Sequence, residues 1–167
     1  PENTLKLLTK SNQSRDNTLF ILAKHHIKLL TSLIKFFSNS SKDHIDDAFN
    51  KKNYDHQTLL AVAMCTQPQE ERERLKNLKT TDSEAYDSTL AFQATQTMEL
   101  VEALQTTLSE NKFKELVVDK GQNNKSILTH ALNLNNRPLF IKIIQLILEL
   151  KNTRLRNQII EEIFTFK

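Results

Sequence analysis

Short apolar segments alternate along the chain with polar stretches that are rich in turn-forming residues. Four of the apolar segments open on Thr or Ser, continue with Leu or Ile, and reach Ala five residues after the start. They are TLFILA at 18–23, TLLAVA at 58–63, SILTHA at 126–131 and a weaker copy, TLAFQA at 89–94. Because their starts are 40, 31 and 37 residues apart in chain order, the pattern indicates a repeat protein whose unit is a short helix pair.

A second apolar pattern follows these segments. After Ala23 and again after Ala94, apolar residues recur at offsets of four, six, seven and ten residues. Spacings of three and four residues predict an amphipathic helix. Polar stretches with Asp, Asn and one Gly come before Thr58, Thr89 and Ser126, and such stretches are typical of turns. Each unit is therefore predicted to contain a polar finger loop, a short helix, a tight turn and a longer helix.

These patterns predict one all-α domain over residues 1–167. The units are expected at about residues 5–40, 48–78, 84–111 and 116–151, with a capping helix at 153–166. The cap rests on Leu155, Ile159, Ile160 and Ile163, which stand at helical spacing. An alternative interpretation stays open, in which residues 68–88 are a long insertion inside an array of three units.

The units resemble the ankyrin repeat, whose period is about 33 residues and whose signature is T-P-L-H-x-A. The matching opening residues are Thr18, Thr58, Thr89 and Ser126, and the matching alanines are Ala23, Ala63, Ala94 and Ala131. The sequence departs from the signature at its Pro, which is Leu or Ile here, and at its His. The His position holds Ile21, Ala61, Phe92 and Thr129.

The resemblance implies a short solenoid of three or four helix–turn–helix units. The opening hydroxyl of each unit is expected to cap its first helix, and the Ala is expected where the paired helices press together. The finger loops and inner helices would line a concave face, which in such stacks binds another protein. Because a unit cannot bury its apolar face alone, the stability would come from its neighbours.

Composition narrows the classes of function. The chain has Gly 1 and Pro 3, which suits helix interiors and excludes the Gly-rich loops that cradle nucleotides. Lys+Arg 23 nearly balance Asp+Glu 20, and the cations are scattered rather than gathered in the stripe of a nucleic-acid binder. No apolar run approaches the roughly 20 residues that span a bilayer. We therefore expect no nucleic acid, no membrane span and no small-molecule substrate.

The sequence offers only weak candidates for metal-binding or catalytic residues. The adjacent His25 and His26 would point about 100° apart on a helix, so they cannot converge on one metal. The acidic run around His44 lacks the spacing of a metal motif. Cys65 is the single cysteine, which excludes an intrachain disulfide and suits a reducing compartment. We expect no catalytic residue, metal or cofactor, and only a cluster of His56, Cys65 and His130 would indicate part of an enzyme.

The predicted binding residues lie in the finger loops before Thr58 and Ser126. Polar, long or aromatic side chains gather there, and Tyr offers a large contact area at low entropic cost. The predicted set is Lys51, Lys52, Tyr54, Asp55, His56, Lys120, Gln122 and Asn123. The competing surface is the outer-helix face, with Glu99, Glu102 and Lys142.

The Gly-poor, Asn- and Lys-rich style resembles the degenerate ankyrin arrays of effector proteins from intracellular bacteria. That resemblance implies a module that docks a host protein inside the host cytoplasm after secretion by a bacterium. The chain starts without Met and ends on IFTFK, so we expect a fragment of a longer protein. Two alternatives stay open: an accessory part of an enzyme whose catalytic domain is missing, and a scaffold that packs on its own protein.

Overall fold

The structure, a computed structural model, describes residues 2–10, 17–39, 42–65, 69–119, 127–128, 131 and 137–164. Within these ranges its elements are helices, which confirms the predicted all-α class. They are α1 (Glu2–Leu8), α2 (Thr18–His25), α3 (Ile27–Phe37), α4 (Lys42–Phe49), α5 (Leu59–Cys65), α6 (Gln69–Thr81), α7 (Ser83–Thr107), α8 (Glu110–Val118), α10 (Arg137–Leu148) and α11 (Thr153–Phe164).

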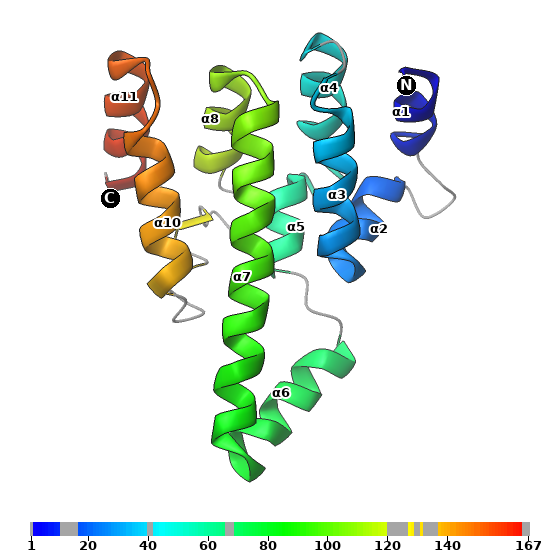
Figure 1. The fold of residues 1–167 in the computed structure, drawn as a ribbon, viewed down its shortest axis with the longest axis vertical. Helices are drawn as coiled ribbons and strands as arrows, with labels where there is room; N and C mark the ends of the chain where they lie inside the picture. Colours follow the sequence, from blue (N-terminus) through cyan, green and yellow to red (C-terminus); the bar gives the residue numbers. More distant parts are fainter. Residues whose placement is uncertain are drawn as a thin grey trace.

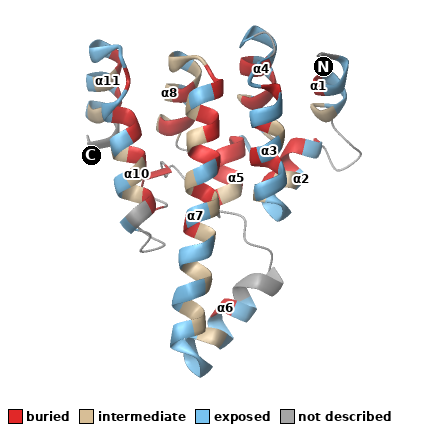
Figure 2. Ribbon diagram, viewed as in Figure 1, coloured by how far each residue is buried: buried red, intermediate tan, exposed pale blue. Residues whose placement is uncertain are grey.

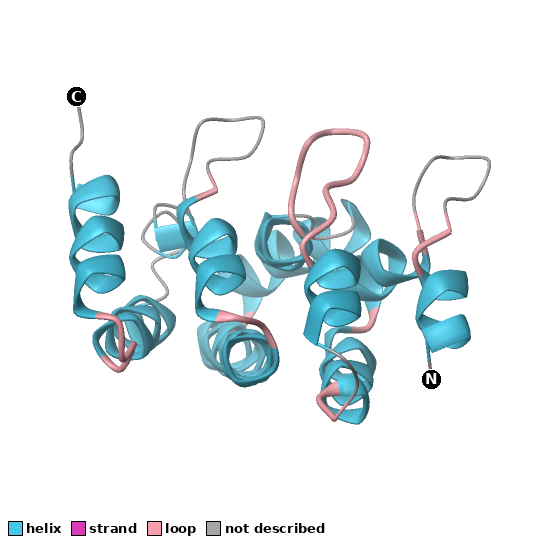
Figure 3. Ribbon diagram, turned by 90° about the horizontal axis from the view of Figure 1, so that it is seen from above, coloured by secondary structure: helices cyan, strands magenta, loops and turns pink. Residues whose placement is uncertain are grey.

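The helices stand side by side in rows (Figures 1 and 3). The first row holds α1, α4, α8 and α11. The second holds the longer helices α3, α7 and α10, with α7 in contact with both of its neighbours. The short helices α2 and α5 pack on each other and against the second row. Buried residues occur along the helices of both rows, whereas the projecting end of α7 and α6 are mostly exposed or intermediate (Figure 2).

Two helices, α4 and α8, lie where the sequence patterns predicted none. The chain runs from α2 through α3 to α4 before the finger loop at 50–58, and afterwards from α5 through α6 and α7 to α8. In α4, Ile45, Ala48 and Phe49 are buried at spacings of three and one residues. That stripe is short and is set among acidic residues, so the apolar pattern alone does not predict a helix there.

The capping predictions are partly corrected. Thr58 does cap α5, because the backbone N–H of Ala61 donates to its hydroxyl at 3.2 Å. The cap of α2 is Asn17 and not Thr18, since the N–H of Phe20 donates to the Asn17 side chain at 3.1 Å. Thr89 caps nothing: its hydroxyl donates to the carbonyl of Ala85 inside α7. Ser126 lies outside the described residues.

The repeated alanines mostly lie in the core, as expected. Ala23, Ala94 and Ala131 are buried, which suits positions where only a small side chain fits between helices. Ala63 is half-buried instead, and Val62 just before it is buried. The register in α5 is therefore turned slightly from the one that the repeated Ala predicted.

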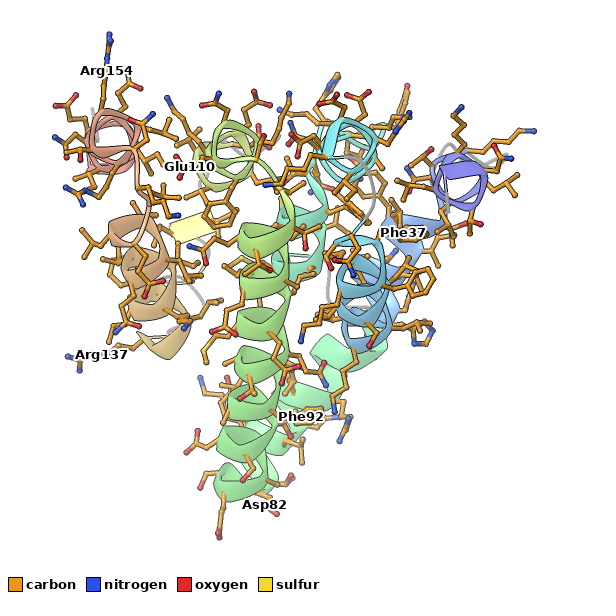
Figure 4. The ribbon with its side chains drawn as sticks, turned by 45° about the horizontal axis from the view of Figure 1, so that its top comes forward. Phe37, Asp82, Phe92, Glu110, Arg137 and Arg154 are labelled. Atoms are coloured by element: carbon orange, nitrogen blue, oxygen red, sulfur yellow. The ribbon has the colours of Figure 1, made fainter. Side chains whose placement is uncertain are left out.

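The expected short helix and turn at TLAFQA are absent, because α7 runs unbroken from Ser83 to Thr107. No Gly or Pro interrupts the segment, and Asp82 caps its start by accepting from the N–H of Ala85 at 3.0 Å. Together α6 and the first half of α7 form an arm that projects beyond the rows, with Asp82 at its tip (Figures 1 and 4). Residues 69–81 form α6. They lie within residues 68–88, which the alternative interpretation treats as a long insertion.

None of the described helices is both long and apolar enough to cross a membrane.

Replacing Ala23 with Leu should overpack the contact of α2 with its neighbours, because the alanine is fully enclosed. We expect a loss of about 1–3 kcal/mol in the free energy of unfolding, measured by urea denaturation. Ala91, exposed on the arm, is the matched control, and its change to Leu should leave stability within about 0.5 kcal/mol. Equal midpoints for the two variants would contradict the packing.

Candidate partner-binding surface

The finger loop at residues 50–58 joins α4 to α5 and is held by the side chain and backbone of Asn53. The N–H of Gln57 donates to the Asn53 carbonyl oxygen of the side chain at 2.8 Å, and the Asn53 amide donates to the Gln57 side chain at 3.2 Å. The backbone of Asn53 donates to Gln57 and accepts from His56, each at 3.0 Å. These four bonds close the loop on itself, so its tip has a defined shape.

His56 takes the left-handed backbone conformation, with φ 58. A non-glycine residue in that region costs about 1–2 kcal/mol, and the bonds of the Asn53 turn hold it there. His56 and its neighbours Tyr54 and Asp55 are exposed at the tip, and the side chain of Tyr54 is 64% exposed. The loop therefore presents an aromatic residue and two polar ones on a fixed backbone, above the row of α1, α4, α8 and α11 (Figure 3).

The two lysines of this loop differ in their surroundings. Lys51 is exposed. Lys52 forms an ion pair with Asp119, whose side chain is largely buried at the end of α8. Part of the basic rim predicted from sequence is therefore used within the protein, because Lys52, although exposed, is paired with Asp119.

The ion pair belongs to a ladder of polar contacts between α4 with its finger loop and α8. At its base, the Ser109 N–H donates to Asp46 at 3.0 Å and the Ser109 hydroxyl donates to the other carboxylate oxygen. Above it, the Asn50 amide donates to Glu115. We call these three contacts, Asp46–Ser109, Asn50–Glu115 and Lys52–Asp119, the α4–α8 ladder. It fixes the finger loop relative to the next unit.

Glu115 also accepts from Lys112 at 3.0 Å. This hydrogen bond and the attraction of Glu115 hold the pKa of Lys112 above its usual value, so Lys112 stays charged and partly compensates the carboxylate within the ladder.

The remaining predicted binding residues, Lys120, Gln122 and Asn123, lie outside the described residues. The structure places Asp119, which directly precedes them, beside Lys52. The two finger loops thus begin from neighbouring points on one edge of the protein.

The competing outer face is used in helix packing. Lys142 of α10 pairs with Glu102 of α7 at 2.6 Å, and the Gln105 amide donates to the carbonyl of Leu146 at 3.3 Å. The hydrogen bond to Glu102 raises the pKa of Lys142. Glu99 is exposed nearby. Glu102 and Lys142 therefore help to join α7 to α10.

The candidate chemical groups do not assemble in the described part of the chain. The rings of His25 and His26 lie 6.3 Å apart and are tilted by 50°. Among the residues that the structure describes, no group of three or more His, Cys, Asp or Glu side chains could hold a metal. The proposed cluster of His56, Cys65 and His130 involves the Cys65 side chain and His130, both outside the described set.

Sequence reasoning missed two exposed features. The arm carries Phe92, over whose ring the Lys28 ammonium lies at 4.8 Å. On α3, Leu29 and Phe36 are exposed, although Leu29 belongs to the apolar pattern that predicted the helix. A helical wheel of residues 27–37 could have found these two residues, since it shows apolar residues on more than one face.

Comparison of the chain with protein-family models, with curated proteins and with solved structures gives no match.

Substituting Gly for His56 should stabilise the protein, because Gly adopts a positive φ without steric cost. We expect a gain of up to about 1 kcal/mol in the free energy of unfolding, reduced by the greater freedom of the unfolded chain. Urea denaturation measures it. Asp55→Gly is the control at a neighbouring position and should destabilise or have no effect. A loss of stability in His56→Gly would show that the imidazole itself supports the loop.

Removing the carboxylate of Asp46 should leave the Ser109 N–H and hydroxyl without their acceptor at a half-buried site. Asp46→Ala is expected to cost about 1–3 kcal/mol, the usual range for hydrogen bonds to a charged group. Asp47 next to it is exposed, so Asp47→Ala should change the unfolding midpoint little. If both variants unfold at the same denaturant concentration, the base of the α4–α8 ladder contributes nothing to stability.

Proposed function

We propose that the chain is a short helical solenoid of ankyrin-like units that binds another protein through the finger loop at 50–58. The proposal is supported by a capped short helix followed by a longer helix, which occurs at α2 and α3 and again at α5 and α7, with α6 between the latter two. The units differ from two-helix ankyrin repeats in carrying a third helix before the next loop. That helix gives the finger loop a rigid base.

The observation that carries the proposal is an exposed aromatic residue on a loop with a fixed backbone. Tyr54 is 64% exposed, and Asn53 closes the loop beneath it with short hydrogen bonds. A loop that is already ordered loses little conformational entropy on binding, so more of the contact energy appears as affinity. Tyr is among the residues that most often dominate protein interfaces.

The charges around Tyr54 favour a protein partner with mixed polarity. Lys51 and Asp55 are exposed on either side of it, and Lys52 is paired with Asp119. This small, nearly balanced set lacks the row of cations that neutralises a phosphate backbone. We therefore propose a protein partner and not a nucleic acid. The further proposal, that the partner is a host protein bound by a bacterial effector, rests on the resemblance in composition alone.

The test is affinity capture from a eukaryotic lysate, followed by kinetics on the captured protein by surface plasmon resonance. Tyr54→Ala should raise the dissociation rate at least ten-fold, because aromatic anchors govern the lifetime of a complex. Lys51→Glu should instead slow association and weaken its salt dependence. Tyr86→Ala, on the arm, is the matched control and should bind as the wild type does.

One further variant separates the finger loop from the outer face. Exchanging the charges of the α7–α10 ion pair, with Glu102→Lys and Lys142→Glu together, keeps their mutual attraction but reverses the surface pattern. If that variant loses the captured protein while Tyr54→Ala keeps it, the binding surface is the outer-helix face and the proposal is wrong.

A further inference from the structure

The row of α1, α4, α8 and α11 extends one place further at its N-terminal end than the row of longer helices. In the view of Figure 3, α3 lies below α4 and α7 lies below α8, but no helix of the described chain lies below α1. α1 itself packs on α4. The faces of α1, α2 and α3 that point toward this place are therefore the faces that a further helix would cover.

Side chains that are buried in later units are exposed in this one. The last residue of α1 precedes the cap Asn17 by as many residues as the last residue of α4 precedes the cap Thr58. Counted back from these caps, Leu7 in α1 therefore corresponds to Ala48 in α4. Leu7 is 68% exposed and Ala48 only 5%. By the same count Ile21 in α2 corresponds to Val62 in α5; their exposed fractions are 40% and 3%. The later residues are covered by neighbouring helices, and the earlier ones have no such neighbour among the described residues.

An apolar stripe on α3 continues this surface. Leu29 and Phe36 are 57% and 71% exposed; seven residues apart, they lie within about 20° of each other on the helix. Lys28 marks the side of α3 that faces α7, because its ammonium lies over the ring of Phe92. Half-buried Leu33 lies between the stripe and the core, on the side away from α7. We call Leu7, Ile21, Leu29 and Phe36 the N-terminal end face.

The charged residues of α1 after Glu2, and those of α2 and α3, are all basic. Residues 3–10 and 17–39 contain no Asp or Glu. The exposed cations are Lys6, Lys10, Lys24, Lys28 and Lys35. An apolar stripe with a basic border is complementary to a helix whose own apolar stripe is bordered by carboxylates.

From this apolar surface, its basic border and the vacant place beneath α1, we propose that the N-terminal end face binds an acidic amphipathic helix of another protein. The bound helix would lie along α3, with leucine-like side chains on Leu29 and Phe36 and with carboxylates toward the lysines. This site is separate from the finger loop, so the chain would bind two partners or two parts of one.

A second copy of the chain is a poorer occupant. At the other end of the rows α11 packs on α10 and lies in the same row as α1, so stacking two copies end to end would bring α11 and α1 into one place. Among residues 137–151, Lys142 pairs with Glu102 of α7, and exposed Arg137 and Lys151 stand against exposed Glu149. That end therefore lacks the excess of carboxylates that would complement the basic border.

The experiment is a selection from displayed peptides of about 20 residues that carry a fixed helical stripe of leucines, with every other position randomised. The baits are the wild type, the double variant Leu29→Glu with Phe36→Glu, and the control Ile141→Glu with Leu148→Glu on the exposed face of α10. The wild type and the control should enrich peptides with acidic borders, and the double variant should not. A selected peptide should lose at least ten-fold in affinity for the double variant by fluorescence polarisation. Circular dichroism confirms that each bait is folded.

Three outcomes would overturn the proposal. The double variant could enrich the same peptides as the wild type, the enriched peptides could have basic borders, or sedimentation could show a dimer that the double variant abolishes. Tyr54→Ala should bind the selected peptide normally, so failure at the finger loop and failure at the end face are told apart.

Discussion

The burial of α7 between α3 and α10 is the contact on which the other arrangements depend. Leu100, Val101 and Leu104 of α7 are fully buried, and each such side chain contributes about 1.5–3 kcal/mol relative to exposure. The Lys142–Glu102 pair at the same junction is a surface ion pair, whose attraction is screened by solvent. Apolar packing between neighbouring helices therefore contributes more to stability than the ion pair does. The ion pair mainly sets the register of α10 against α7.

The finger loop obtains its position from that packing through the α4–α8 ladder. Ser109 stands in the short connection between α7 and α8, and its N–H donates to Asp46. Because Lys52 reaches the far end of α8 at Asp119, both ends of α8 are tied to the preceding unit. The exposed Tyr54 thus stands on a loop whose base is fixed by two helices and whose tip is fixed by Asn53.

The sequence predicted where several helices begin better than it predicted which helices and side chains contact one another. Local signals found the start of α2 and the cap Thr58, because capping depends on a few adjacent residues. The length of α7 was missed because Ala94 carries the repeat pattern while nothing after it stops a helix. The candidate site shows the same division. Exposed Tyr54 could be predicted from its polar surroundings, whereas the pairing of Lys52 with Asp119 joins residues far apart in sequence. Leu7 and Ala48 occupy matching positions, and only the presence or absence of a covering helix makes one exposed and the other buried.

The unbroken course of α7 gives the protein a mechanical property. Its 25 residues make a rod of about 38 Å at 1.5 Å per residue, with the C-terminal half clamped in the core and the other half free of the rows (Figure 2). A load applied near Asp82 would not be absorbed in a hinge, since no Gly or Pro lies along the rod. It would arrive as torque between α3 and α10, so that pulling on the arm would act directly on the junctions that hold the helices in line.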